Sequence, residues 1–303
     1  MKIIGGLVTR LTTALWFVGT SLALDFGFLS VSDWCLKRKL YFIGKKYWEI
    51  LLLQTKVKPF KLGQSFIPFL GRHIYYDSPF GLAGYESMIA RHQKMIKEVV
   101  IGPLRNVVDV GANVGFFSLM MRDLFPSIRV FAIEPVPNIF RCLSKNLSSF
   151  DARVSCLAFS NKVGRESMKF NELESSRSQI ISESCTKNVD ARGIVIDVPT
   201  TTLDKFCLEN AIEYIDFLKI DTEGFESHVL KGAQNTLSRT HYLHIEINVE
   251  GNENYTFSEI NSLLFSENFN FQLLYFRNYT DKGFGLLPVG DFLFKNVKLS
   301  RGW

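Results

Sequence analysis

The sequence predicts an α/β fold with a mostly parallel sheet, helices on both of its faces and an antiparallel hairpin at its C-terminal end. Two observations predict this fold. Apolar, β-branched runs alternate with longer amphipathic segments between residues 105 and 267, as expected where helices connect parallel strands. Further along, residues 269–278 and 285–294 flank Asp281-Lys282-Gly283, a turn-forming sequence that indicates a hairpin.

The other elements can be assigned in chain order from the same patterns. Residues 66–76 are expected to form a strand and residues 86–99 a helix. The core of the sheet then follows as strand 105–110, helix 114–124, strand 128–134, helix 136–148, strand 153–159, strand 215–221, helix 224–238, strand 241–248 and helix 256–267.

An insertion interrupts this alternation. Segments 164–171 and 194–198 are expected to form short additional strands. The segment between them, residues 172–193, is Ser-rich and charged and lacks periodicity, which predicts a flexible loop. Two interpretations of this loop stay open, a cover over the active site or a plain surface loop.

The first core strand runs into a turn with the pattern D-x-G-x-N-x-G, from Asp109 to Gly115. Gly111 and Gly115 permit a tight turn and a close approach of the backbone to a ligand. A helix is predicted directly after the turn, so backbone N–H groups and a helix N-terminus are expected to face a carboxylate or phosphate. A strand–turn–helix junction without any ligand is the alternative interpretation.

An acidic residue ends the next strand at the spacing that suits a ribose. Glu134 lies 19 residues after Gly115, close to the distance at which a carboxylate binds the ribose hydroxyls in nucleotide-binding βαβ units. The dinucleotide fingerprint has a middle glycine, which is replaced here by Asn113, and Phe116 follows Gly115. The pattern therefore disfavours a nicotinamide dinucleotide. It resembles motif I of the class I S-adenosylmethionine-dependent methyltransferases, and this resemblance implies a ligand with an adenosine but no pyrophosphate.

Three further runs complete a family pattern: V-P-T-T-T-L-D at residues 198–204, K-I-D-T-E-G-F-E at 219–226 and H-I-E-I-N at 244–248. Together with D-V-G-A-N-V-G, they resemble the FkbM-type methyltransferases, which are class I and Rossmann-like, from about Phe66 to Asn296. The resemblance implies a seven-stranded sheet and S-adenosylmethionine as methyl donor. It also implies O-methylation of a hydroxyl on a sugar, glycolipid or polyketide-like acceptor.

Polar residues at the carboxyl ends of the predicted strands are the candidates for binding the cofactor, because open α/β sheets bind ligands there. The turn 111–115 is expected to hold the methionine part, Glu134 the ribose hydroxyls and Asn161 the adenine. The full set of predicted cofactor-binding residues is Asp109, Gly111, Ala112, Asn113, Gly115, Glu134 and Asn161.

Three residues are candidate catalytic bases, since methyl transfer to an alcohol requires alignment of the oxygen and removal of its proton. Asp221 ends its strand and is expected to face the cleft. Glu223 follows at the helix start, where a carboxylate is equally explained as a partner of the helix dipole. His228 lies five residues after Glu223, on a different helix face, which favours a structural role.

Neither a Mg²⁺ site nor a zinc site is expected from the sequence. Asp221, Glu246 and Asn248 offer oxygen ligands that could hold Mg²⁺ and activate a hydroxyl. However, Glu246 and Asn248 alternate with apolar residues along a strand, as buried hydrogen-bonded groups also would. A zinc site from His241, His244 and Glu246 is rejected because the two histidines are three residues apart on a strand and face opposite sides.

The composition is ordinary for a globular chain of 303 residues, with 47% hydrophobic and 21% charged residues. Positive charge is concentrated in residues 1–61, whose ten Lys or Arg and three acidic residues give a net charge of +7, whereas the remainder sums to −2. Residues 62–303 therefore show no electrostatic signature of nucleic-acid binding. The five cysteines include no C-x-x-C pair, so neither a disulfide framework nor a zinc site is indicated.

Residues 1–61 are expected to be an apolar and basic segment ahead of the methyltransferase domain, residues 62–303. The apolar run at residues 11–24 leaves three interpretations open: a secretory signal, a membrane anchor or a helix packed on the domain. Basic residues after the run outnumber those before it, which favours a cytoplasmic catalytic domain. Residues 36–54 have the pattern of a basic amphipathic helix, which can lie on an anionic membrane surface.

The expected partner is a small-molecule, glycan or glycolipid acceptor, with no nucleic acid. A non-catalytic cofactor-binding or membrane-associated scaffold module of the same fold is the alternative function. A protein that had lost turnover could also lose Asp221 and Glu223 without unfolding, so their presence favours the enzyme.

Overall fold

The computed structural model describes residues 40, 43–44, 66–69, 72–76, 92–170, 179–180, 194–250, 256–265, 269–278 and 289–299. The chain divides into two compact units, residues 1–61 with 78–98, and residues 62–77 with 99–303. The first unit contains most of helix α4 (Lys94–Val99). Among the described residues, no helix is long and apolar enough to cross a membrane.

Several expectations fall on residues outside this description. They concern the apolar run 11–24, nearly all of the basic segment 36–54, most of the insertion 172–193 and the turn at 281–283. They stay predictions from the sequence.

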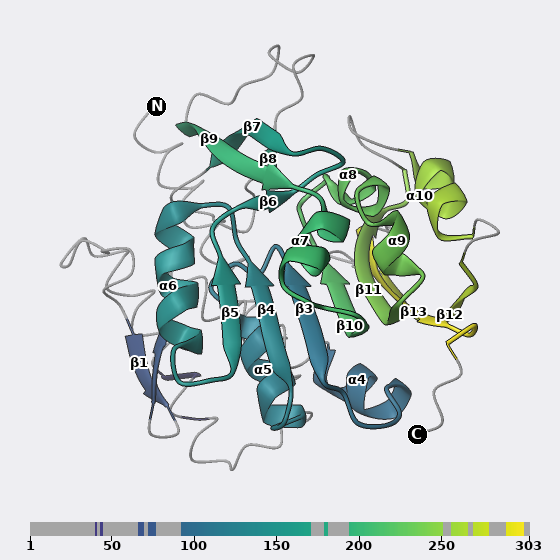
Figure 1. Ribbon diagram of the computed structural model, residues 1–303. Helices are drawn as coiled ribbons and strands as arrows, with labels where there is room; N and C mark the ends of the chain where they lie inside the picture. Colours follow the sequence, from purple (N-terminus) through teal and green to yellow (C-terminus); the bar gives the residue numbers. More distant parts are fainter. Residues whose placement is uncertain are drawn as a thin grey trace, which may run out of the picture. The chain divides into compact units, whose positions relative to one another are not determined.

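The second unit is built on a seven-stranded sheet, shown in Figure 1, with the strand order β12-β13-β11-β10-β3-β4-β5. Its strands are β3 (Asn106–Val110), β4 (Arg129–Ile133), β5 (Ala152–Ser155), β10 (Ile215–Ile220), β11 (Thr240–Asn248), β12 (Phe271–Asn278) and β13 (Val289–Asn296). The five strands from β11 to β5 are parallel, and β13 pairs antiparallel with both β11 and β12. The predicted parallel sheet with a C-terminal antiparallel hairpin is therefore confirmed.

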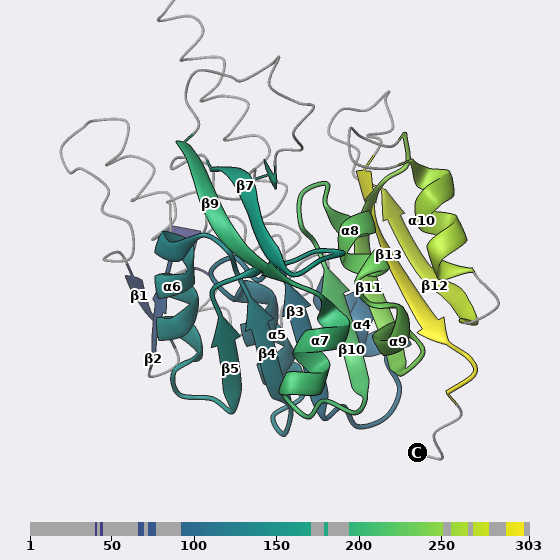
Figure 2. The same cartoon turned by 45° about the horizontal axis from the view of Figure 1, so that its top comes forward.

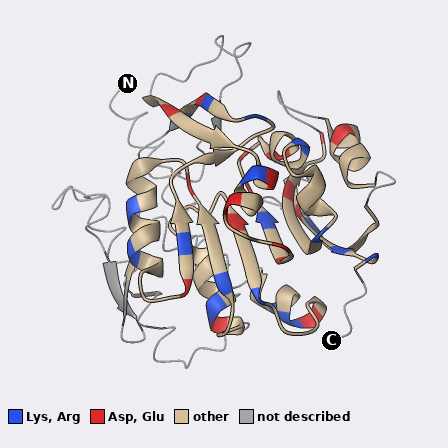
Figure 3. Cartoon of the chain, in the orientation of Figure 1, with Lys and Arg blue, Asp and Glu red and all other residues tan. Residues whose placement is uncertain are grey.

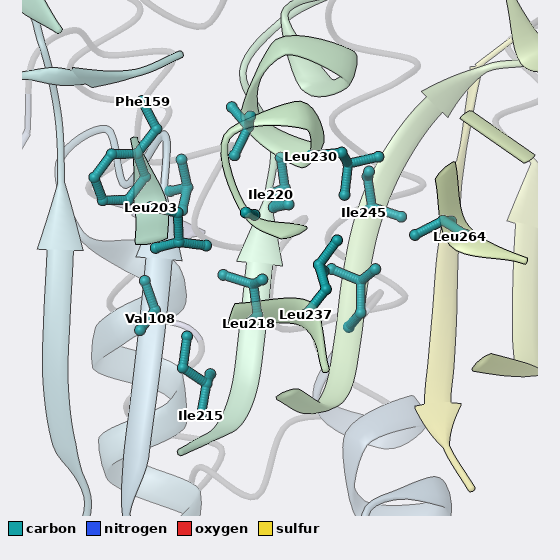
Figure 4. Packing of buried hydrophobic residues seen from close by; sticks show 14 of the residues in the cluster. Val108, Phe159, Leu203, Ile215, Leu218, Ile220, Leu230, Leu237, Ile245 and Leu264 are labelled. Carbon is teal, nitrogen blue, oxygen red and sulfur yellow. The ribbon is translucent and has the colours of Figure 1, made fainter. Parts of the chain in front are cut away.

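Helices cover both faces of this sheet because its strands are apolar on both sides. Helix α5 (Phe116–Leu124) packs on one face, where the rings of Phe117 and Phe217 lie 5.8 Å apart. The opposite face packs on α7 (Leu203–Glu209), α8 (Glu226–Lys231), α9 (Gln234–Leu237) and α10 (Phe257–Leu264). Figure 4 shows the hydrophobic core on this opposite face. Val108, Leu218 and Ile245 of the strands belong to the same buried cluster as Leu203, Leu230 and Leu264 of the helices.

Between β10 and β3 the order of the strands reverses, and this reversal sets the position of a ligand site. From β3 the chain moves outward through β4 and β5, and it later returns to place β10 on the other side of β3. The loops that follow β3 and β10 therefore depart in opposite directions. Open α/β sheets bind ligands at such a point, outside the carboxyl ends of the strands.

A second sheet, with the order β6-β9-β7-β8, lies across these carboxyl ends in Figures 1 and 2. It consists of β6 (Ala158–Phe159), β7 (Gly164–Phe170), β8 (Gln179–Ile180) and β9 (Ile194–Thr201). The prediction of a single strand at 153–159 is therefore wrong. The first part of this run belongs to β5, which pairs with β4 in the large sheet, whereas its last two residues form β6, which pairs with β9 in the second sheet. Strand β9 also continues past the predicted end at residue 198, and β8 falls within the segment predicted to be a loop.

The predicted helix 224–238 is likewise divided into two shorter helices, α8 and α9. The first begins at Glu226, and the break between them lies at Gly232. A Cβ atom at Gly232 would lie 2.1 Å from the carbonyl oxygen of Ser160, so the backbones touch at this break. Helix α7 has no counterpart in the prediction. Thr202 caps it by accepting a hydrogen bond from the backbone N–H of Lys205.

One smaller difference concerns the N-terminal part of the chain. The predicted strand 66–76 is a hairpin of two strands, β1 (Phe66–Phe69) and β2 (Arg72–Tyr75). Helix α6 (Pro137–Leu147) begins with proline, which suits the first turn because it needs no N–H donor there. In Figure 3, acidic and basic residues are interspersed over the elements in view, and residues of one charge do not gather in a single area.

Candidate functional site

A pocket lies at the carboxyl ends of β3, β4 and β10, where the strand order reverses. Five of the predicted site residues line it: Gly111, Asn113, Glu134, Asp221 and Glu223. The other lining residues are mostly apolar, namely Val110, Ile133, Pro135, Leu157, Ala158, Phe159, Met168, Thr222 and Phe225. Asp109, Ala112, Gly115, Asn161 and His228 were also predicted for the site and do not line this pocket.

The backbone of the turn 111–115 is bonded to the protein itself. The N–H groups of Gly111 and Ala112 both donate to the carbonyl oxygen of Ile133, at 3.1 and 2.9 Å, and the N–H of Gly115 donates to Ala112 at 2.8 Å. The expectation that these donors face a ligand is therefore wrong. Gly111 and Asn113 of this turn line the pocket, and Oδ1 of Asn113 accepts the N–H of Val114 at 2.7 Å.

Both glycines of the turn have a positive φ, and Gly111 is also required by its contact with a neighbouring backbone. Gly111 has φ +74°, and a Cβ atom there would lie 1.8 Å from the carbonyl oxygen of Asp221. Gly115 has φ +91°, and its Cβ would lie 2.8 Å from Cδ1 of Leu143 in α6. The first glycine thus allows the turn after β3 to touch the backbone that carries Asp221, and the second lets α5 begin against α6.

Glu134 is held rigidly at the end of β4. Its Oε2 accepts the N–H of Asn113 at 3.0 Å, and its Oε1 accepts the N–H of Val136 at 2.9 Å. The side chain is buried, yet it lines the pocket. A carboxylate oxygen can accept more than one hydrogen bond, so the bonds from Asn113 and Val136 are compatible with a diol as a further partner of Glu134.

An apolar wall stands beside Glu134. Leu157, Phe159 and Met168 come from β6, β7 and the loop before them, and Phe225 faces the pocket from the β10 side. Sequence reasoning missed Phe159 and Met168 because they reach the pocket through the second sheet. Asn161, the predicted adenine contact, is exposed and does not line the pocket.

Asp109 lies beneath the pocket. Its side chain is fully buried, its Oδ2 accepts the hydroxyl of Ser118 at 2.7 Å, and its Oδ1 lies 3.6 Å from Nζ of Lys219. Lys219 also lies 3.1 Å from Oδ2 of Asp221. Lys219 is part of the K-I-D run, but its position within an apolar strand gave no indication that it reaches the site.

Three carboxyl groups meet on the β10–β11 side. Oxygen atoms of Asp221, Glu223 and Glu246 lie within 4.8 Å of one another. Burial, followed by the neighbouring charges of Asp221 and Glu223, raises the pKa of Glu246 well above its ordinary value. The expected pair Asp221 and Glu246 is thus brought together, whereas the side chain of Asn248 accepts the N–H of Glu250.

Glu226 holds the turn that carries Glu223. Its Oε1 accepts three hydrogen bonds, from the N–H and hydroxyl of Thr222 at 2.9 and 3.0 Å and from the N–H of Gly224 at 3.1 Å. Glu223 itself has φ +53°, in the left-handed region. Burial raises the pKa of Glu226, while the backbone donors of Gly224 and Thr222 oppose this shift.

Replacing Glu226 by alanine is expected to lower the free energy of unfolding by about 1–3 kcal/mol, since it removes the buried carboxylate that accepts hydrogen bonds from the partly buried N–H groups of Thr222 and Gly224. Glu226→Gln keeps a carbonyl oxygen and is expected to cost less. Unfolding in urea at several pH values measures both.

The raised pKa of Glu226 adds a pH dependence of known sign. Folding favours the protonated form, so this residue makes the protein less stable as the pH rises from 4.5, its ordinary value, through its raised pKa. Glu226→Gln should remove that part of the slope. Equal losses for the alanine and glutamine variants would contradict the anchoring role.

His228 lies behind the pocket wall. Its ring stacks on Phe225 with 4.0 Å between the ring centroids, and its Nδ1 is 3.4 Å from the hydroxyl of Ser227. Burial, followed by the positive charge of Lys231, lowers the pKa of His228. The imidazole is therefore placed to support Phe225, and of the three candidate bases only Asp221 and Glu223 line the pocket.

Comparison with known proteins adds independent information. The family model described as the methyltransferase FkbM domain matches residues 109–273, which is more than half of the chain. This range contains the pocket and all of its lining residues.

Three curated relatives are similar over about half of this chain. "Methyltransferase sdnD" of Sordaria araneosa is 28% identical, over 49% of this chain and 67% of its own. "2-O-methyltransferase NoeI" of Sinorhizobium fredii is 29% identical, over 46% of this chain and 62% of its own. "Hexuronic acid methyltransferase AglP" of Haloferax volcanii is 26% identical, over 46% of this chain and 54% of its own.

Proposed function

The chain belongs to the FkbM methyltransferase family, and we propose that it transfers the methyl group of S-adenosylmethionine to a hydroxyl group of a sugar or a related small-molecule acceptor. The observation that carries this proposal is the placement of Glu134. This carboxylate is fixed by two backbone N–H groups, at the end of the second parallel strand, beside an apolar wall. An acidic group for a ribose diol next to an apolar slot for a base fits an adenosine.

The names of the relatives support a hydroxyl acceptor. One is named a 2-O-methyltransferase and another a hexuronic acid methyltransferase. The hydroxyl group comes from the first of these names, and the carbohydrate-like acceptor comes from the second. Polyketide-like and glycolipid hydroxyls belong to the same proposal, because the chemistry at the reacting oxygen is the same.

Within the proposed reaction, S-adenosylmethionine supplies a methyl group on a positively charged sulfur, which an oxygen can attack in line. Asp221 is proposed as the general base, because it lines the pocket and is already paired through one oxygen with Lys219. Its task would be to take the hydroxyl proton as the new C–O bond forms and the bond between the methyl carbon and sulfur breaks, with S-adenosylhomocysteine as the leaving group. Glu223, on the turn held by Glu226, is proposed to orient the acceptor.

The proposal is tested by titrating the full-length chain with S-adenosylmethionine in a calorimeter. Glu134→Ala is expected to weaken binding at least tenfold, since hydrogen bonds to a charged group are worth about 1.5–3 kcal/mol. Glu209→Ala removes an exposed acid in α7 and should leave binding unchanged. A wild-type chain that is folded by circular dichroism and binds no S-adenosylmethionine would contradict the proposal.

Methyl transfer is then followed with radioactive S-adenosylmethionine and a panel of monosaccharides, glycolipids and hydroxylated small molecules. Label that appears in an acid-stable, base-stable product supports an ether, as an O-methylated alcohol requires. Label found only on amines would contradict the proposed hydroxyl acceptor and would indicate methyl transfer to nitrogen.

A further inference from the structure

A buried lysine stands at the centre of the parallel sheet. Lys219 belongs to β10, whose six residues are all buried, and only 3% of its surface is exposed. In the strand register it lies beside Asp109 of β3 and His244 of β11. Lysine is almost never fully buried without a partner, because burying an isolated charge is costly.

The ammonium group of Lys219 has partners on two sides. Its Nζ lies 3.6 Å from Oδ1 of Asp109 and 3.1 Å from Oδ2 of Asp221, and it sits 5.6 Å from the ring centre of Phe117. Burial alone would lower the pKa of Lys219, but the charges of Asp221 and Asp109 raise it above its ordinary value. The two carboxylates therefore favour the protonated, positively charged form of Lys219.

These contacts connect two parts of the site that the chain places far apart. Asp109 ends β3, just before the turn 111–115, and its Oδ2 is also held by the hydroxyl of Ser118 in α5. Asp221 follows β10, on the other side of the strand reversal. A continuous path of contacts thus runs from Ser118 through Asp109 and Lys219 to Asp221 at the pocket.

We propose that Lys219 is a positioning residue, which fixes the carboxylate of Asp221 relative to the turn 111–115 so that one oxygen stays turned toward the acceptor. Oδ2 of Asp221 is engaged by Lys219, which leaves Oδ1 to meet a substrate proton. The role rests on the proposed function in one respect, since it takes Asp221 as the proton acceptor. The positioning of Asp221 by itself can be observed without any ligand.

A purely structural ion pair is the competing explanation, and a pair of variants separates the two. Lys219→Met removes the ammonium and leaves the fully buried Asp109 without its counter-charge, so this variant is expected to be less stable. The double variant Lys219→Met/Asp109→Asn removes both charges, and its melting temperature is expected to recover. Asp109→Asn alone keeps Lys219 next to Asp221 and is the matched control.

Three measurements on these chains decide the role of Lys219. Crystal structures without ligand are expected to show the Asp221 carboxylate displaced in the double variant and in place in Asp109→Asn. The Kd for S-adenosylmethionine should change by less than about threefold between these two variants. With the acceptor found in the methylation panel, the kcat of the double variant is expected to fall at least 100-fold below that of Asp109→Asn, a drop of the size that loss of general base catalysis produces.

Two results would overturn the positioning role. One is an Asp221 carboxylate that keeps its place in the double variant, and the other is a kcat that recovers together with the melting temperature. A wild-type chain that does not bind S-adenosylmethionine is a different result. It would contradict the proposed function, while the position of Asp221 in the two ligand-free crystal structures would still decide what Lys219 does.

Discussion

Replacing Asp221 by asparagine is expected to slow methyl transfer by about 10²–10⁴-fold, the usual contribution of a positioned general base. The substitution preserves the size of the side chain but removes its ability to take a proton. Asp221 lines the pocket and contacts Lys219 through Oδ2, so an asparagine can occupy the same position. The affinity for S-adenosylmethionine is expected to stay within a few-fold, because Glu134 and the apolar wall are untouched.

Glu223→Gln is the matched control for this experiment. Both residues line the same pocket and have oxygen atoms within 4.8 Å of each other. The comparison therefore separates the loss of the proton acceptor from the general effect of removing a negative charge from the pocket. Single-turnover rates with saturating S-adenosylmethionine separate the chemical step from product release. If Glu223→Gln lost the greater share of the rate, Glu223 and not Asp221 would be the base.

Local sequence patterns predicted the sheet and the three strand ends at which the pocket lies. The strands β3, β4 and β10 are short, apolar and bounded by glycine or acidic residues, so their ends could be located from the sequence. Parallel strands bring those ends together, and this placed Gly111, Glu134 and Asp221 in one pocket. These residues are close in space because of sheet topology, which an alternating β–α pattern predicts.

The parts that the sequence did not predict depend on non-local pairing or on burial. The apolar end of the run 153–159 could continue β5, and only its pairing with β9 sends Phe159 to the pocket wall. The second sheet brings Met168 there as well. Asn161 was a natural candidate for the adenine because polar residues follow many strands, yet its side chain is exposed.

Lys219 and Glu226 were missed for a different reason. Each is charged, and each belongs to a run that was recognised as a family pattern, but charge alone indicates a solvated position. Their burial became visible only with their partners, two carboxylates for Lys219 and the donors of Thr222 and Gly224 for Glu226. His228 was a candidate base for which the sequence favoured a structural role, and in the structure its ring stacks on Phe225.

Gly111→Ala is expected to destabilise the fold by about 2–6 kcal/mol, which combines backbone strain of about 1–3 kcal/mol with overpacking of about 1–3 kcal/mol. The strain arises because Gly111 has φ +74°, where a residue with a Cβ atom is disfavoured. The overpacking arises because the new Cβ would lie 1.8 Å from the carbonyl oxygen of Asp221. Backbone atoms of two neighbouring loops must separate to admit it.

Gly164→Ala is the control, since the nearest atom to its added Cβ is Oγ1 of Thr200 at 3.9 Å, an ordinary contact. Unfolding in urea should therefore separate the two variants by at least about 1 kcal/mol, with Gly111→Ala the less stable. The separation has a functional consequence, because the carbonyl that moves belongs to Asp221. Any Gly111→Ala protein that folds should bind S-adenosylmethionine more weakly and transfer methyl groups more slowly than Gly164→Ala. Equal stability and equal rates would mean that the close approach of these two loops is not needed for the site.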